Sequence, residues 1–244
     1  MNEKLRVLVV SHAHPALSLG GAEIASHNLH RGLNALPNVE SVYLARVGHP
    51  VPRHAASALM SLRLAEDELL YHADDYDHFF LSNGDTQTIS RDLLRFARDL
   101  RPHVIHFHHV LGIGLEALYA LREAFPHAAI VVTFHEYLSI CHNHGQMVKR
   151  PSGQLCETAS PVACHGCFPD IPVSRFLKRE QFTRGMLELA DAFVSPSRFL
   201  ADRYAAWGID RDKLCVIENG VVVEAAAAPR ALQGPKARRN RFAY

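Results

Sequence analysis

Histidines are concentrated at two places where a run of apolar residues ends. His106 and His108 alternate along the first run, so on a β-strand they would share one face, as a two-histidine metal site requires. His109 follows them directly, and His135 and Glu136 follow the second run. No carboxylate follows the first cluster closely enough to complete a metallohydrolase centre, so the spacing does not favour a catalytic metal.

Four of the five cysteines lie between residues 141 and 172, in a segment without helical or strand periodicity. They are Cys141, Cys156, Cys164 and Cys167. The last two form a C-x-x-C knuckle, and thiolates so arranged can hold a structural Zn²⁺, with free thiols as the alternative. Three histidines of the segment are candidate substitutes for a thiolate: His142, His144 and His165. Cys215 falls in a predicted buried strand and is expected to be an ordinary core residue.

Glycines precede two predicted helices. Gly20 and Gly21 follow the apolar run 5–10 and a loop, and they open an amphipathic helix. Free N–H groups at such a corner attract phosphate, and glycine lets a ligand approach the backbone; the alternative is a simple tight turn. The GIGLEA sequence at 112–117 matches the G-x-G-x-x-A dinucleotide fingerprint, with Glu136 downstream. That fingerprint belongs to the first strand–helix turn, and here it follows about the fourth strand, so we interpret these glycines as a helix start.

The elements that carry these residues alternate between strand and helix. Predicted strands cover 5–10, 41–46, 78–81, 104–107, 129–134, 192–194 and 214–217, and predicted helices include 89–100, 114–125, 173–189 and 198–207. Residues 55–70 are expected to form a helix or a loop, and 141–172 is an insertion. The alternation predicts an α/β fold with a doubly wound, Rossmann-like parallel sheet. Ligands of such sheets bind beyond the carboxyl ends of the strands.

Five motifs at these strand ends resemble the amino-terminal domain of the GT-B fold glycosyltransferases of the retaining family 4. They are GGAE at 20–23, VIHFH at 104–108, TFHEY at 133–137, SPSRFL at 195–200 and VIENGV at 216–221. The resemblance implies an acceptor-side domain over 1–221, with the insertion 141–172. It also implies that 222–244 form a linker and the start of a carboxy-terminal donor domain. Such an enzyme transfers a sugar from a nucleotide-sugar donor to an acceptor hydroxyl with retention, and its catalysis requires no cofactor.

The same resemblance assigns roles to individual residues. His135 lies beside the reacting sugar and would stabilise it by hydrogen bonding, without acting as a nucleophile. Donor-binding residues would be Gly20, Gly21 and Arg198; acceptor-binding residues would be His106, His108, His109 and Glu136; hinge residues would be Glu218, Asn219 and Gly220. Because neighbouring residues on a strand face opposite ways, we expect only one of His135 and Glu136 in the site. Ser197 is expected to cap the following helix, and Arg198 has a surface position as its alternative.

The sequence stops before the family's Glu-x7-Glu motif, so we expect a fragment that is inactive without the second domain. The acceptor, a saccharide or a lipid-linked molecule, is not specified. Two alternatives remain: an NAD-dependent oxidoreductase, and a non-catalytic binding or assembly module. In the module, the cysteine segment and the basic tail would bind a partner chain.

Net charge and hydropathy limit the classes of partner that the chain is expected to bind. The 244 residues carry a net charge of +1, which gives no indication of nucleic-acid binding. No run is long enough for a transmembrane helix, and the first apolar run is too short for a signal peptide, so we expect a cytoplasmic protein with reduced cysteines. The tail is basic and is the one segment expected to touch an anionic membrane surface. Its charged residues are Glu224, Arg230, Lys236, Arg238, Arg239 and Arg241.

Overall fold

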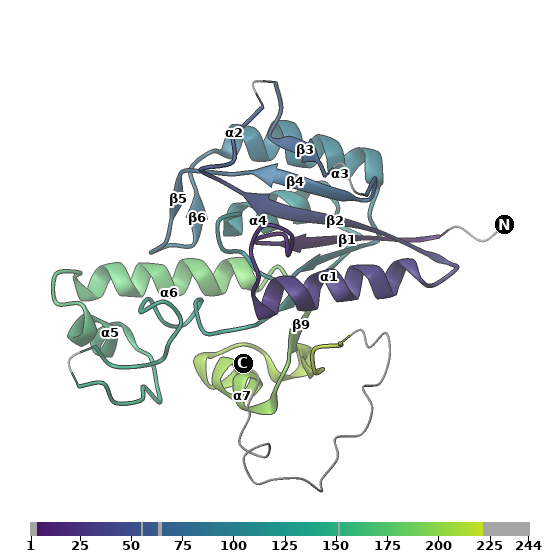
Figure 1. Cartoon of the computed structure of the whole chain (residues 1–244). Coiled ribbons are helices and arrows are strands. Elements are labelled where there is room, and N and C mark those ends of the chain that lie inside the picture. Colours follow the sequence, from purple (N-terminus) through teal and green to yellow (C-terminus); the bar gives the residue numbers. More distant parts are fainter. Residues whose placement is uncertain (1–3, 55, 63–64, 151, 222–244) are drawn as a thin grey trace, which may run out of the picture.

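A central sheet organises the chain (Figure 1). The computed structural model describes residues 4–54, 56–62, 65–150 and 152–221. The sheet has eight strands in the order β10-β9-β8-β7-β1-β2-β4-β3, parallel except for β3. The strands are β1 (Leu5–Ser11), β2 (Val39–Val47), β3 (Leu59–Ser61), β4 (Glu68–His72), β7 (Val104–Phe107), β8 (Ala129–Thr133), β9 (Ala192–Ser195) and β10 (Leu214–Val216). The predicted fold class is confirmed.

Helices cover both faces of the sheet, as the apolar strands require. In β1, Leu8 and Val10 face the larger core, whereas Val7 and Val9 face a smaller one. Helix α1 lies over the smaller core, on the near side of β1 and β2 in Figure 1. The other elements are α1 (Gly21–Asn34), α2 (Thr86–Thr88), the π-helical turn η1 (Ile89–Leu93), α3 (Leu94–Leu100), α4 (Leu115–Ala124), α5 (Pro161–Cys167), α6 (Val173–Leu187), α7 (Arg198–Trp207) and η2 (Arg211–Lys213).

Residues 55–81 differ from the prediction. The expected helix or loop contains β3 and β4, and the expected strand 78–81 is a turn between two short strands, β5 (Tyr76–Asp77) and β6 (Ser82–Asn83). The apolar side chains of this turn are held by contacts with α6, because the Phe79 ring lies 5.2 Å from that of Phe176. Leu81 has a φ of 56°, which a strand does not allow.

The insertion 141–172 lies beside α6, and its one helix, α5, contacts that helix. Cys215 is exposed, contrary to the expectation of a core position, because β10 is the last strand of the sheet. Among the described helices, none combines the length and apolarity needed to cross a membrane. The predicted linker and basic tail at 222–244 fall outside the described residues.

Candidate active site

The predicted site residues meet where the strand order reverses. β1 lies between β2 and β7, so the crevice at the carboxyl ends of β1 and β7 is the topological switch point of the sheet. His12 follows β1, His108 and His109 follow β7, and His135 follows β8. Since these three strands are parallel neighbours, their ends bring the four imidazoles together at one edge.

His135 is held by a second histidine. Nδ1 of His108 lies 3.1 Å from Nε2 of His135, and the two rings are stacked. The His106 ring lies 4.4 Å from that of His108, and its Nε2 is 2.7 Å from the hydroxyl of Thr133. His106 and His108 therefore share a face, as the strand alternation predicted, and that face is directed at His135.

Four of these imidazoles are held neutral. Burial lowers the pKa of His106 to about 4, and burial also holds the pKa of His108 well below its ordinary value. The pKa of His135 is lowered to about 4, first by burial and then by the neighbouring histidines. For His12, burial and His109 outweigh the opposing effect of Glu23, and its pKa is also about 4. These four rings therefore offer neutral hydrogen-bonding groups at pH 7.

A polar chain links α1 to the end of β8. Nε2 of His12 lies 3.3 Å from Oε1 of Glu23, and the His12 ring lies 4.6 Å from that of His109. Nδ1 of His109 accepts the N–H of Leu111, so in the neutral ring Nε2 carries the proton, and this atom lies 3.1 Å from Oε1 of Glu136. His12 and Glu23 are functional candidates that sequence reasoning missed. The position of His12 just after β1 was the available signal.

His135 and Glu136 line the same pocket, contrary to the expectation that only one would do so. The strand ends at Thr133, so the alternation of faces does not extend to these two residues. The pocket has an empty volume of about 320 Å³ and is also lined by His109 and Tyr204. Nδ1 of His135 has no hydrogen-bond partner among the described residues. Oε2 of Glu136 is buried and also has no hydrogen-bond partner among them. Nδ1 of His135 is therefore available to a polar ligand, whereas Oε2 of Glu136 is covered by the protein next to Gly145.

The glycine pair opens α1 as predicted. Gly20 is the N-cap residue in an extended conformation, and no side chain caps the helix. A Cβ placed on Gly21 would meet nothing within 4 Å, so the protein itself does not require glycine there. Glu23 is buried in the first turn, and one of its carboxylate oxygens lies near Gly20. The N-terminus of α1 thus combines exposed backbone donors with one negatively charged neighbour.

The second glycine pair has a packing role. Gly112 and Gly114 have φ values of 74° and 95°, and a Cβ on Gly114 would lie 2.7 Å from the backbone nitrogen of Asn83. The carboxylate of Glu116 in the first turn of α4 accepts hydrogen bonds from Ser82 and from the N–H of Asn83. β6 and Glu116 therefore occupy the start of α4, where a dinucleotide pyrophosphate would have to bind. This supports the interpretation of the GIGLEA glycines as a helix start.

Arg198 and the predicted hinge lie at the neighbouring strands. Ser197 caps α7 by accepting the N–H of Leu200, as predicted. Arg198 is exposed and has no hydrogen bond or ion pair among the described residues. Glu218, Asn219 and Gly220 are exposed beyond β10. The carbonyl of Gly220 accepts a hydrogen bond from the side chain of Asn28 on α1, at 3.4 Å, which ties the end of the described chain to the helix of the glycine pair.

Arg46 is a cation near the histidine cluster, and the sequence analysis did not identify it as a site residue. It lies in β2, and its guanidinium donates to the carbonyl of Ala73 at 2.6 and 2.9 Å. A Cβ on Gly112 would lie 2.8 Å from its Nε, so the glycine makes room for the guanidinium. Its charge contributes to the lowered pKa of His12.

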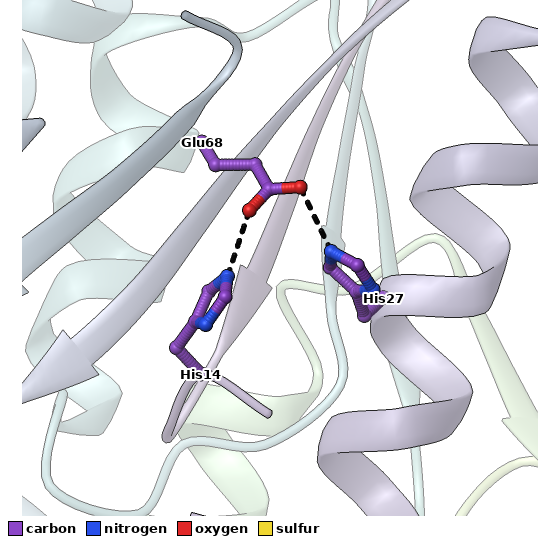
Figure 2. Close-up of side chains that lie close together, drawn as sticks. All are labelled: His14, His27 and Glu68. Atoms are coloured by element: carbon purple, nitrogen blue, oxygen red, sulfur yellow. Dashed lines mark hydrogen bonds and ion pairs between the residues drawn. The ribbon is translucent and has the colours of Figure 1, made fainter. Parts of the chain in front are cut away.

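A second histidine group joins α1 to β4 (Figure 2). Glu68 accepts from Nε2 of His14 and from Nε2 of His27, both at 2.8 Å. Among the described residues, His14, His27 and Glu68 form a group of three potential metal ligands, and their ligand atoms all lie within 4.8 Å of one another. However, the N–H of Ala16 donates to Nδ1 of His14, so the proton of the neutral ring resides on Nε2 and points at Glu68. That tautomer makes the group a hydrogen-bonded brace. His14 and Glu68 are 54 residues apart, and no sequence pattern connected them.

The four cysteines of the insertion come together. All four are free thiols, and all four line one pocket with an empty volume of about 410 Å³. Burial raises the pKa of Cys164 to about 11, so this thiol is not an activated nucleophile. Of the three histidines proposed as substitute ligands, His142 lines the pocket, whereas Nδ1 of His165 is bonded to the carbonyl of Ile171.

Comparisons with known proteins agree with this geometry. Sucrose-phosphate synthase from Thermosynechococcus elongatus superposes with a TM-score of 0.54 at 13% identity, over 88% of this chain and 48% of that one. The catalytic domain of starch synthase IV from Arabidopsis thaliana, bound to ADP and acarbose, gives 0.51 at 12% identity, over 90% and 52%. At these identities the likeness concerns the fold. The present chain spans about half of each of these chains.

No curated protein matches the sequence. The sequence profile described as Glycosyltransferase Family 4 matches residues 19–225, which include the glycine pair, the insertion and every histidine of the cluster except His12. The match covers most of the 244 residues. The chain therefore belongs to glycosyltransferase family 4.

Proposed function

We propose that this chain forms the acceptor side of a glycosyltransferase that moves a sugar from a nucleotide-sugar donor to an acceptor hydroxyl, with retention of configuration. Family membership supports the reaction class. The solved relative that carries ADP and acarbose supports a nucleotide and a saccharide as the two kinds of ligand. The observation that carries the proposal is the group of neutral imidazoles at the switch point, with His135 at its centre.

In this proposal His135 orients and stabilises the reacting sugar. Nε2 is engaged with His108, so Nδ1 is the atom that meets the ligand. If Nε2 donates to His108, Nδ1 accepts a hydrogen bond from a sugar hydroxyl; if Nε2 accepts, Nδ1 donates a hydrogen bond to the sugar. A neutral ring suits either arrangement, since it places no charge beside the positive charge that develops on the sugar during transfer. Retention follows if the donor's own phosphate assists the incoming hydroxyl.

The acceptor is proposed to enter beside Glu136. Rotation of the Glu136 side chain would let its unpartnered Oε2 atom accept a hydrogen bond from an acceptor hydroxyl, while Oε1 lies 3.1 Å from Nε2 of His109. A carboxylate, two imidazoles and the apolar wall of Tyr204 are suited to a polyhydroxylated molecule and not to an anionic one. The acceptor hydroxyl would therefore come from a saccharide or from the saccharide portion of a lipid-linked molecule.

The donor diphosphate is proposed to bind at the N-terminus of α1, against Gly20 and Gly21. Backbone N–H groups there point out of the helix without a capping side chain. The buried Glu23 lies close by, and its Oε1 atom is 3.3 Å from Nε2 of the neutral His12. Most of the donor site is assigned to a second domain, in keeping with the half-length coverage of the solved relatives. Arg198 would face that domain.

The decisive experiment assays the protein in its natural reading frame with a panel of nucleotide sugars and measures release of nucleoside diphosphate. We expect turnover with at least one nucleotide sugar and a product whose anomeric configuration, determined by NMR, matches that of the donor. Inversion would contradict retention. Stabilisation by NAD(H) but by no nucleotide diphosphate, with no sugar released, would contradict the proposal and favour the oxidoreductase alternative.

A further inference from the structure

The insertion joins the main hydrophobic core through Met147, but its later part, from 148 to 172, is ordered with little buried apolar surface. Among the described residues from 148 to 172, none is buried, and Leu155 and Val162 are 75% and 69% exposed. The segment nevertheless has regular structure: it forms α5, and a bridge between Val148 and Leu155 closes a turn. Small segments that cannot bury apolar surface are usually stabilised by covalent or metal cross-links.

The cysteines are the residues that connect its parts. Cys141 lies at the start of the insertion, Cys156 follows the turn, and Cys164 and Cys167 lie one helical turn apart at the end of α5. All four side chains border the same pocket, so the three segments meet at sulfur atoms. Four convergent thiols from a C-x-x-C knuckle and two further positions are a donor set that selects zinc.

A buried cation lies next to this pocket. Arg179 of α6 is only 3% exposed, and its guanidinium donates to the carbonyls of Phe79, Leu138 and Ser139 at 2.5 to 2.8 Å. Within the described part of the chain it forms no ion pair with a carboxylate. Cys164 and Arg179 line a common small pocket, and negative charge on Cys164 or Cys141 would act favourably on the guanidinium. A buried charge of this kind is costly unless an opposite charge lies nearby.

We propose that the four cysteines hold a structural zinc ion and that Arg179 balances its charge. Each thiol loses its proton to solvent as its sulfur binds Zn²⁺, so four protons are released, no electrons are transferred, and the tetrathiolate carries a double negative charge. The sulfurs are more widely spaced than the atoms of the His14–His27–Glu68 group. Coordination at about 2.3 Å would therefore have to draw them inward.

The experiment measures metal in the protein purified without chelators. We expect about one equivalent of zinc per chain by elemental analysis, and four thiols that react with a thiol reagent only after chelation. Replacement of zinc by Co²⁺ should produce the strong visible and charge-transfer bands of tetrahedral thiolate coordination. This spectrum is recorded on the unaltered protein, so it tests the site even if a cysteine variant fails to fold.

Two substitutions serve as matched controls. Cys164→Ser should lose the zinc, whereas Cys215→Ser, at an exposed thiol on β10, should retain it. His27→Gln should also retain it, because the brace of Figure 2 is assigned no metal. Protein that contains no zinc and whose four thiols react at once would overturn the proposal. The proposal would also be overturned if Cys164→Ser kept its zinc or if His27→Gln lost it. A Co²⁺ spectrum without thiolate bands would overturn it as well.

Discussion

Nδ1 of His108 and Nε2 of His135 lie 3.1 Å apart, and this contact joins the carboxyl ends of β7 and β8. One ring donates and the other accepts, so the orientation of His135 depends on the protonation of its neighbour. Burial keeps both rings neutral. The pair therefore fixes a single nitrogen of His135 toward the pocket.

Removing the His135 imidazole should abolish most activity while leaving the fold intact. We expect His135→Ala to lower kcat by about a hundredfold or more, because the proposed hydrogen bond strengthens as charge develops on the sugar. His127→Ala, at an exposed position before β8, is the control and should retain full activity. Steady-state kinetics and thermal unfolding are measured together. An unchanged kcat would remove His135 from the site, and a large fall in Tm would indicate a structural role.

A side chain at Gly21 should block the donor without disturbing the protein. A Cβ there meets nothing within 4 Å, so Gly21→Val should change the free energy of unfolding by less than about 0.5 kcal/mol. It should nevertheless raise KM for the nucleotide sugar far more than KM for the acceptor, because the new side chain occupies the path of the diphosphate. If calorimetry shows undiminished nucleotide diphosphate binding in this variant, the glycine pair only forms a turn.

Substitution of Gly114, unlike that of Gly21, should destabilise the fold without changing donor binding. With a φ of 95° and the backbone of Asn83 2.7 Å from its would-be Cβ, Gly114→Ala should destabilise the chain by about 2 kcal/mol or more. Chemical denaturation measures this loss. KM for the donor should stay the same in the fraction that folds, since the start of α4 is assigned no ligand. A stable variant would show that the turn adapts and that packing does not explain the glycine.

The contrast between Gly21 and Gly114 shows which structural features could be predicted from the sequence and which could not. Strands β1, β7 and β8 were predictable because each is a short apolar run, and their parallel pairing placed the histidines that follow them at one edge. The sequence separated Gly21 from Gly114 only by the order of the strands that precede them, because the packing difference comes from β6, which contacts α4. β6 itself lay where the prediction failed.

The other elements and residues that the sequence analysis mispredicted or missed also depend on tertiary contacts. Glu68–His72 has no alternation typical of a half-buried strand, and its pairing with β2 comes from tertiary contacts. The apolar run 78–81 resembled a strand, but its rings pack against α6, about a hundred residues later in the chain. His12 and Glu23 became candidates only when their side chains were seen to meet at 3.3 Å.

Glu136 should affect the acceptor specifically. Its Oε2 atom is a buried acceptor without a hydrogen-bond partner among the described residues, and Oε1 lies 3.1 Å from Nε2 of His109. Glu136→Gln removes the charge at similar volume, and we expect KM for the acceptor to rise about tenfold or more, as the loss of a charged hydrogen bond implies. KM for the donor should be unaffected. An equal rise for both substrates would place Glu136 outside the acceptor site.

His106 should make stability depend on pH in a defined interval. Burial lowers its pKa to about 4, whereas the unfolded chain binds the proton near its ordinary pKa of 6.5. Between these values the unfolded state holds more protons, so stability falls as the pH is lowered from 6.5 to 4 and is fully present above 6.5. His106→Gln should reduce the slope of unfolding free energy against pH by about 1.4 kcal/mol per unit. Parallel slopes for the two proteins would mean that folding does not lower the pKa of His106.

Glu68 should contribute stability with a different pH dependence. Its burial would raise its pKa, but hydrogen bonds from His27 and His14 outweigh that effect and leave the pKa below its ordinary value. The stabilisation is therefore present above the unfolded pKa of the carboxyl and is lost as the pH falls through the folded one.

Glu68→Gln should accordingly cost about 1–3 kcal/mol at pH 7, and the difference from the unaltered protein should shrink at acid pH. Glu66→Gln, at an exposed carboxylate two residues earlier, is the control and should be nearly neutral. A double-mutant cycle with His27→Ala measures the coupling directly. Additive effects would show that the brace of Figure 2 adds nothing to stability. A positive coupling energy would identify it as the link that holds α1, and with it the glycine pair, against β4.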